Sequence, residues 1–163
     1  MMRLCSQMKS KLPFFFLIVF LTSFTSDQPC KEISSSDILG TYWNEIKDVK
    51  VRIFLAQNGK YSGKVVWLRN PLNDDGSVKR DPYNPNPVLR DRERVGLVII
   101  KYFEFNDKEK RWEGGSVYNP KNGRTYQGYI QFNDNNTDKV FLRGYILGLS
   151  WLGRTEMWTR VAD

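Results

Sequence analysis

The sequence predicts an all-β fold: a single antiparallel up-and-down barrel of about eight strands. From residue 40 onward, apolar and polar residues alternate with a period of two in short runs, which is typical of strands with one buried face. Turn residues separate these runs, and no segment shows a sustained helical period with caps. Because most runs follow one another through hairpin-length links, a closed barrel is favoured over the alternative, a β-sandwich.

The first 26 residues are typical of a secretory signal peptide. Basic residues precede the apolar run 13–21, and small polar residues follow it. This run is too short for a transmembrane helix, which needs about 20 apolar residues. We expect cleavage after Thr25, or alternatively after Ser26. The mature chain is then exported, periplasmic or extracellular, with no transmembrane segment.

Removal of the leader changes the cysteine count and the charge of the chain. Cys5 is lost, so the mature chain keeps only Cys30 and forms no internal disulfide. The residues before Cys30 are not the small and aliphatic types that a lipoprotein processing site takes, so we do not expect anchoring there. The leader also removes three basic residues, leaving 22 against 18 acidic ones. The remaining charges are interleaved, which argues against a nucleic-acid partner.

The mature chain divides into a short extension, 27–39, and a single barrel domain, 40–163. Within the extension, 34–39 is expected to form one helical turn with a serine cap. The pair Asn58-Gly59 predicts a type I′ hairpin turn, which needs positive φ at both residues. The strands are expected at 40–46, 49–55, 61–67, 97–105, 111–118, 124–132, 139–146 and 154–161.

One connection, the loop 69–96, is much longer than compact domains usually tolerate without a functional reason. It mixes prolines with charges of both signs and has no low-complexity repeat, so we expect it to be ordered and to form the working surface. Its candidate ligand-binding residues are Asp81, Asn84, Asn86, Arg90 and Arg92.

These loop residues have simpler interpretations as well. The carboxylates and amides suit a hard cation such as calcium, but their spacing does not match an EF-hand, and capping of turns around the prolines accounts for them without a metal. We therefore predict no metal site. Arg90 and Arg92 suit a carboxylate or phosphate ligand, or alternatively pair with Asp91 and Glu93 beside them.

An apolar patch outside the loop is a further candidate. The segment 148–153 is expected to link the last two strands, and it places Trp151 between leucines and two glycines. Such a patch could form a pocket rim or a contact surface.

The composition limits catalysis. The chain contains no histidine, which excludes His-dependent hydrolytic triads and His-dependent zinc sites. Cys30 has neither a base nor a second thiol near it in sequence, so it is a poor nucleophile candidate. We assign no catalytic residue and no cofactor.

Several motifs together resemble the bacterial domain-of-unknown-function family 2147, over nearly the whole mature chain. They are 40–43 (GTYW), the loop pattern in 81–96 (DPYNPNPVLRDRERVG), and 143–145 (RGY) through 153–160 (GRTEMWTR). The family's members are typically small exported proteins with no established activity, so the resemblance supports export and implies no reaction.

The opening strand also resembles that of lipocalins, in which an arginine of the last strand packs across a tryptophan and closes the barrel base. The family pattern is closer to Gly-x-Trp, which would place the tryptophan at Tyr42, whereas here it is Trp43. Either Tyr42 takes the inward position or the strand bulges. The resemblance implies that Tyr42 or Trp43, with Trp158 and Arg160, closes the barrel.

Three functions are consistent with the sequence. The leading hypothesis is a non-enzymatic binding or accessory protein of the cell envelope, which holds a small ligand in or over the barrel mouth. The second is a small enzyme that uses Asp, Arg or Tyr on a polar substrate. The third is a structural or protein-interaction module that uses the Trp151 patch. The partner is accordingly an unknown small molecule or envelope protein.

Overall fold

The computed structural model describes residues 32–133, 136–146 and 149–162. The predicted signal peptide, 1–26, and Cys30 lie outside these residues. A single turn of 3-10 helix, η1 (Ser35–Ile38), begins the regular structure, with Ser34 as its N-cap. This turn confirms the expected helical turn within 34–39. In the part of the chain that is described, no helix is long and apolar enough to cross a membrane.

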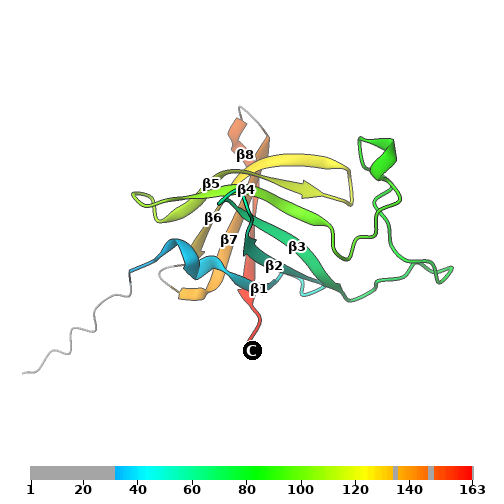
Figure 1. The fold of residues 1–163 in the computed structure, drawn as a ribbon, viewed down its shortest axis with the longest axis horizontal. Coiled ribbons are helices and arrows are strands. Elements are labelled where there is room, and N and C mark those ends of the chain that lie inside the picture. The colour runs from blue at the N-terminus through cyan, green and yellow to red at the C-terminus, as the bar shows by residue number, and fades with distance from the viewer. Residues whose placement is uncertain (1–31, 134–135, 147–148, 163) are drawn as a thin grey trace, which may run out of the picture.

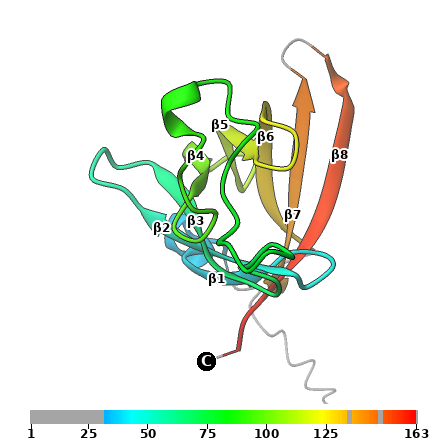
Figure 2. The ribbon, with the colours of Figure 1, turned by 90° about the vertical axis from the view of Figure 1, so that its right-hand side faces the viewer.

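Eight antiparallel strands close into a barrel in sequence order, which confirms the predicted fold class and excludes the sandwich (Figures 1 and 2). Closure leaves the first and last strands paired with each other. The strands are β1 (Gly40–Trp43), β2 (Val49–Leu55), β3 (Tyr61–Leu68), β4 (Val98–Asn106), β5 (Arg111–Asn119), β6 (Arg124–Asn133), β7 (Asn136–Ile146) and β8 (Leu149–Arg160).

The expected link at 148–153 is wrong, because β8 already begins at Leu149. Ile146 pairs with Leu149 and Tyr145 pairs with Gly153 across a register shift, so the hairpin of β7 and β8 continues almost to its tip. Gly153 is a site of close strand approach and not of a turn, since a side chain there would meet the Gly144 carbonyl at 2.5 Å. Trp151 therefore lies on a strand.

The predicted type I′ turn is also wrong, although its hairpin is present. The Gly59 N–H donates to the Ala56 carbonyl at 3.0 Å, and the Ala56 N–H donates to the Lys60 carbonyl at 2.9 Å. Gly59 has a φ of 75°, while Asn58 is not among the described residues with positive φ. The connection is a three-residue loop, a type I turn followed by a glycine bulge, which needs positive φ at the glycine alone.

Side chains fill the end of the barrel next to η1. Trp112 is fully buried, and its Nε1–H donates to the Ser35 carbonyl at 3.1 Å. Its ring packs against Phe105 at 4.9 Å and edge-on against Phe132 at 5.3 Å between centroids. The 3-10 helix η1 therefore covers this end of the barrel, and the hydrogen bond from Trp112 of β5 holds it there.

Arg160 connects the first strand, the last strand and η1 at the same end. Its guanidinium lies 4.8 Å from the Tyr42 ring centroid and donates to three carbonyl oxygens, those of Asp37 at 2.6 Å, Leu39 at 2.7 Å and Thr137 at 3.1 Å. Gly40 leaves room for this group, because a side chain at that position would collide with the guanidinium.

Tyr42, and not Trp43, takes the inward position. Tyr42 is fully buried and its hydroxyl donates to the Ile38 carbonyl at 3.0 Å. Trp43 faces outward, where it packs edge-on against Trp67 with the Lys50 ammonium 4.5 Å above its ring. Trp158 is buried on β8, and its Nε1–H donates to the Glu156 carboxylate at 3.2 Å.

We predict that Arg160→Ala lowers the free energy of unfolding by about 2–4 kcal/mol, because it removes a cation–π contact and three charge-assisted hydrogen bonds together. Urea denaturation measures the change. Arg52→Ala is the matched control, because Arg52 is exposed on β2 and has no polar partner among the described residues. A loss in Arg160→Ala no larger than in the control would contradict this role.

Candidate functional site

The long connection between β3 and β4 lies at the barrel end opposite to η1, where it forms an ordered extension beside the strands (Figures 1 and 2). It contains a short 3-10 helix, η2 (Pro87–Leu89). Two isolated antiparallel bridges give it internal order, one between Leu72 and Val78 and one between Arg80 and Glu93. The loop is therefore a folded unit.

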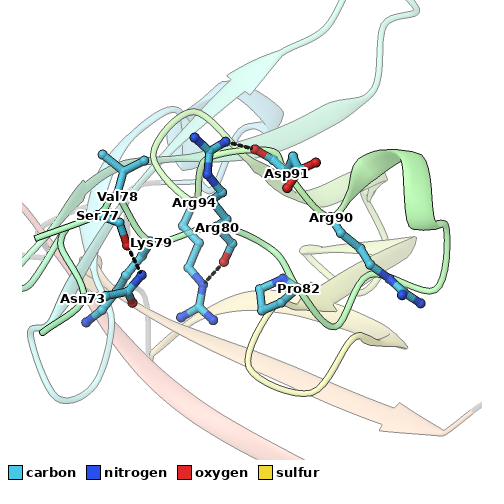
Figure 3. Close-up of a pocket in the computed structure, with 9 residues that line it drawn as sticks. All are labelled: Asn73, Ser77, Val78, Lys79, Arg80, Pro82, Arg90, Asp91 and Arg94. Carbon is cyan, nitrogen blue, oxygen red and sulfur yellow. Dashed lines mark hydrogen bonds between the residues drawn. The ribbon is translucent and has the colours of Figure 1, made fainter. Parts of the chain in front are cut away.

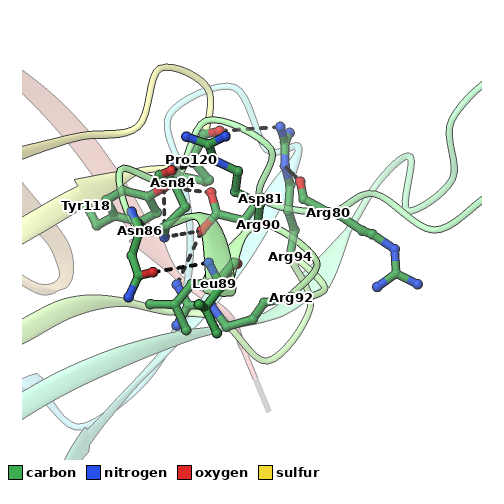
Figure 4. Close-up of polar contacts among 11 residues, drawn as sticks. Arg80, Asp81, Asn84, Asn86, Leu89, Arg90, Arg92, Arg94, Tyr118 and Pro120 are labelled. Carbon is green, nitrogen blue, oxygen red and sulfur yellow. Dashed lines mark hydrogen bonds and ion pairs between the residues drawn. The ribbon is translucent and has the colours of Figure 1, made fainter.

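A buried carboxylate attaches this unit to the barrel (Figure 4). Asp81 has an exposed fraction of 0%. Its Oδ1 accepts a 2.6 Å hydrogen bond from the Tyr118 hydroxyl of β5, and its Oδ2 accepts from the Asn84 side-chain amide at 2.8 Å. Arg92 forms an ion pair with Oδ2 at 3.3 Å. We call Asp81, Asn84, Arg92 and Tyr118 the loop latch.

The rest of this segment is held by turn chemistry. The Asn86 side chain accepts from the Val88 N–H and caps η2, and the Asn84 side chain accepts from the Asn86 N–H at 3.0 Å. Arg90 donates through Nε to the Asn84 carbonyl at 2.9 Å. Arg90 thus bonds to Asn84, and Arg92 bonds to Asp81 and to the Leu89 carbonyl; neither pairs with the adjacent acidic residues considered from the sequence.

The loop also touches the turn between β5 and β6. Gly123 has a φ of 70°, and a side chain there would collide with the Tyr83 carbonyl. Arg94 donates to the Pro120 carbonyl of the same turn at 3.4 Å. Glycine at 123 therefore allows the loop backbone to approach the barrel closely.

The latch changes the acidity of its tyrosine. Burial, followed by the hydrogen bond to the Asp81 carboxylate, raises the pKa of Tyr118 to about 12. Both influences oppose the phenolate, because the anion would lose water and face a second negative charge. Tyr118 thus remains a hydrogen-bond donor throughout the neutral range.

A hollow of about 520 Å³ lies within the loop, next to the latch (Figure 3). Its volume lies within the range of small-molecule sites, about 300–1,000 Å³. Four of its nine lining residues are basic and one is acidic, and only Val78 and Pro82 are apolar. The basic residues are Lys79, Arg80, Arg90 and Arg94, and the acidic one is Asp91.

Five of the sequence-predicted ligand residues lie in the loop, and the structure gives them different surroundings. Asp81, Asn84 and Arg92 belong to the latch, Asn86 caps η2, and Arg90 alone lines the hollow. The sixth, Trp151, lies outside the loop on β8 with an exposed fraction of 75%. Within the described residues, no group of three or more His, Cys, Asp or Glu side chains is placed to hold a metal ion.

Sequence reasoning missed Tyr118 and most of the hollow. Tyr118 is 37 residues from Asp81 in the chain, and only the tertiary fold shows that they meet. A usable signal for the hollow was present, because basic residues recur at 79, 80, 90, 92 and 94 within a single loop.

The chain is similar to known proteins in two respects. The family model DUF2147, described as an uncharacterized protein conserved in bacteria, matches residues 40–160. Among solved structures, the chain resembles protein HP1028 from the human pathogen Helicobacter pylori, which is described as belonging to the lipocalin family. That pair shares 27% sequence identity with a TM-score of 0.63, and the match covers 77% of this chain and 84% of that chain. No curated protein matches the chain.

We predict that Asp81→Ala lowers the free energy of unfolding by about 2–4 kcal/mol, because three donors lose a buried acceptor. Tyr118→Phe removes one hydroxyl and is expected to cost about 1–2 kcal/mol. Urea denaturation measures both changes, and limited proteolysis should cut the loop faster in both variants. The control is Tyr83→Phe, which removes a hydroxyl from an exposed tyrosine of the same loop. If Asp81→Ala leaves stability and cleavage unchanged, the latch does not hold the loop.

Alkaline pH should lower the free energy of unfolding, because two tyrosines hold their protons more tightly in the folded state. Burial is the main cause that raises the pKa of Tyr42, as of Tyr118, from 10.0 to about 12. Since the folded state holds these protons more tightly, their contribution to stability is complete below pH 10 and is lost as the pH rises toward 12. Urea denaturation across this range should show a smaller decline for Tyr118→Phe than for the unchanged protein. Equal declines would contradict the assignment to Tyr118.

Proposed function

The chain belongs to the DUF2147 family of bacterial proteins, and on that premise we propose that it is an exported, non-enzymatic binding protein of the cell envelope. A small molecule occupies the hollow of the loop, over the end of the lipocalin-like barrel that η1 does not plug. In this proposal the barrel is the rigid support and the loop carries the site.

The observation that carries this proposal is an ordered loop that forms an open hollow and is tied to the barrel by a buried carboxylate. A connection with no role would not need the latch. Because the latch and η2 order the loop before any ligand arrives, binding loses little conformational entropy. The site is therefore preorganised.

Export is supported by the N-terminal pattern, in which basic residues precede an apolar run and small polar residues follow. The ligand would then be a molecule present outside the cytoplasm.

The enzymatic alternative is weakened by the position of the buried acid. Both carboxylate oxygens of Asp81 accept hydrogen bonds from protein groups, and Asp81 does not line the hollow. A general base must reach a proton of the substrate, and this carboxylate faces the protein instead.

A protein-interaction role has one specific observation in its favour. Four apolar side chains are exposed near the end of the hairpin of β7 and β8, which projects from the barrel (Figure 2). They are Ile146, Leu149, Trp151 and Leu152. Exposed apolar patches of this kind mark contact surfaces, and this one can be changed by mutation without altering the hollow.

Native mass spectrometry of the protein purified from its own cell envelope tests the proposal. We expect a mature chain that begins after Thr25 or Ser26 and carries a small molecule released on denaturation. Ser77→Trp should abolish that extra mass by filling the hollow, whereas Ser150→Trp, on exposed β8, should retain it.

Other outcomes would count against the proposal. An intact leader on a cytoplasmic protein would overturn export. A folded protein whose extra mass persists in Ser77→Trp would place the ligand elsewhere. A macromolecular partner that is lost in Trp151→Ala, with no small molecule bound, would favour the interaction role.

A further inference from the structure

The basic residues of the hollow are oriented by neutral acceptors. Arg90 donates to the Asn84 carbonyl at 2.9 Å, and Arg94 donates to the Arg80 carbonyl at 2.8 Å and the Pro120 carbonyl at 3.4 Å. Arg80 donates to the backbone carbonyl of Asp91. These bonds fix the side chains without cancelling their charge, because a carbonyl oxygen has no formal charge.

The charges therefore remain uncompensated within the described part of the chain. Among the described residues, no ion pair includes Arg80, Arg90, Arg94 or Lys79, and the Lys79 ammonium has no polar partner. The arrangement contrasts with the latch, in which Arg92 pairs with a carboxylate. Four cations and one carboxylate line the hollow, which gives it an excess of three positive charges.

We infer that the hollow binds a small anion that bears at least two negative charges on carboxylate or phosphate groups. This inference rests on the proposed function and names the chemical class of its ligand. Guanidinium groups already held in place suit planar or tetrahedral oxyanions, because they can donate pairs of parallel hydrogen bonds. After its bonds to the protein, each of the three arginines still has free N–H groups.

The lining also argues against an apolar ligand. Pockets for apolar molecules are lined mostly by hydrophobic and aromatic side chains, whereas only Val78 and Pro82 are apolar here. Asn73 and Ser77 add further polar groups on one side of the hollow (Figure 3). A fatty acid could satisfy one cation but would leave its chain in water.

The hollow is open to solvent, which predicts how binding responds to salt. Arg80, Arg90 and Asp91 are exposed, so their field is screened with a Debye length of about 10 Å at 0.1 M salt. We expect the affinity for a multivalent anion to fall as salt increases, and the affinity for a neutral molecule of similar size to stay constant.

Isothermal titration calorimetry with inorganic phosphate, citrate and glucose tests the inference. Phosphate or citrate should bind and glucose should not, and the stronger of the two anions tells a phosphate source from a carboxylate source. Lys79→Gln should weaken anion binding about five- to ten-fold, because it removes a cation that has no structural partner. Lys108→Gln is the matched control, since it makes the same change on an exposed turn at the far end of the barrel.

The outcomes separate this inference from the proposed function. Equal losses in Lys79→Gln and Lys108→Gln would mean non-specific attraction and overturn the inference. If neither anion binds, but Ser77→Trp removes a neutral ligand found on the purified protein, the ligand class is wrong and the proposed function stands. If neither anion binds and the purified protein carries no small molecule, both are wrong.

Discussion

The burial of the Asp81 carboxylate is the constraint on which the loop end of this protein depends. An ionised carboxyl group cannot be withdrawn from water unless donors replace its hydration. Here those donors come from two places: Asn84 and Arg92 belong to the loop, and Tyr118 belongs to strand β5. Satisfying one charge therefore requires the loop to lie against the barrel. The docked position in turn brings Tyr83 against Gly123 and sets the hollow beside the strands.

The two ends of the barrel have different roles. At the η1 end, Arg160 closes the first strand on the last, and it donates to carbonyl oxygens of η1, of the η1 C-cap Leu39 and of β7. Trp112 and Tyr42 fill the interior there, so this end contributes packing and stability. At the loop end, buried polar groups of Asp81 and Asn84 hold the loop, and the basic residues of the hollow are half-buried or exposed. A closed sheet permits this division, because no strand of a complete barrel relies on the loop for pairing.

The sequence was most informative where a pattern is local. The alternation in β2 and β3 gave the correct strand bounds to within one residue, and closure by the last-strand arginine followed from a family resemblance. It was least informative at glycines, because glycine occurs both in turns and where two strands approach closely. Gly153 looked like part of a turn but marks close strand approach, and Gly59 took the positive φ that was expected of Asn58 as well. The partner of Asp81 could not be predicted, because period-two alternation places residues on a face without saying which distant loop will cover it.

The loop also shows why interleaved charges along a chain do not imply neutral surfaces in space. The acidic residues of 69–96 are interleaved with basic ones, a pattern that argues against a nucleic-acid partner but says little about local surfaces. Folding gives the acidic residues different surroundings: the Asp81 carboxylate is buried in the latch with Arg92, and the Asp75 carboxylate, which does not line the hollow, accepts hydrogen bonds from Ser77 in a turn. The remaining arginines are held by carbonyl groups. The recurrence of basic residues at 79, 80, 90 and 94 is visible in the sequence, and the structure shows that they line one hollow with a single acidic residue.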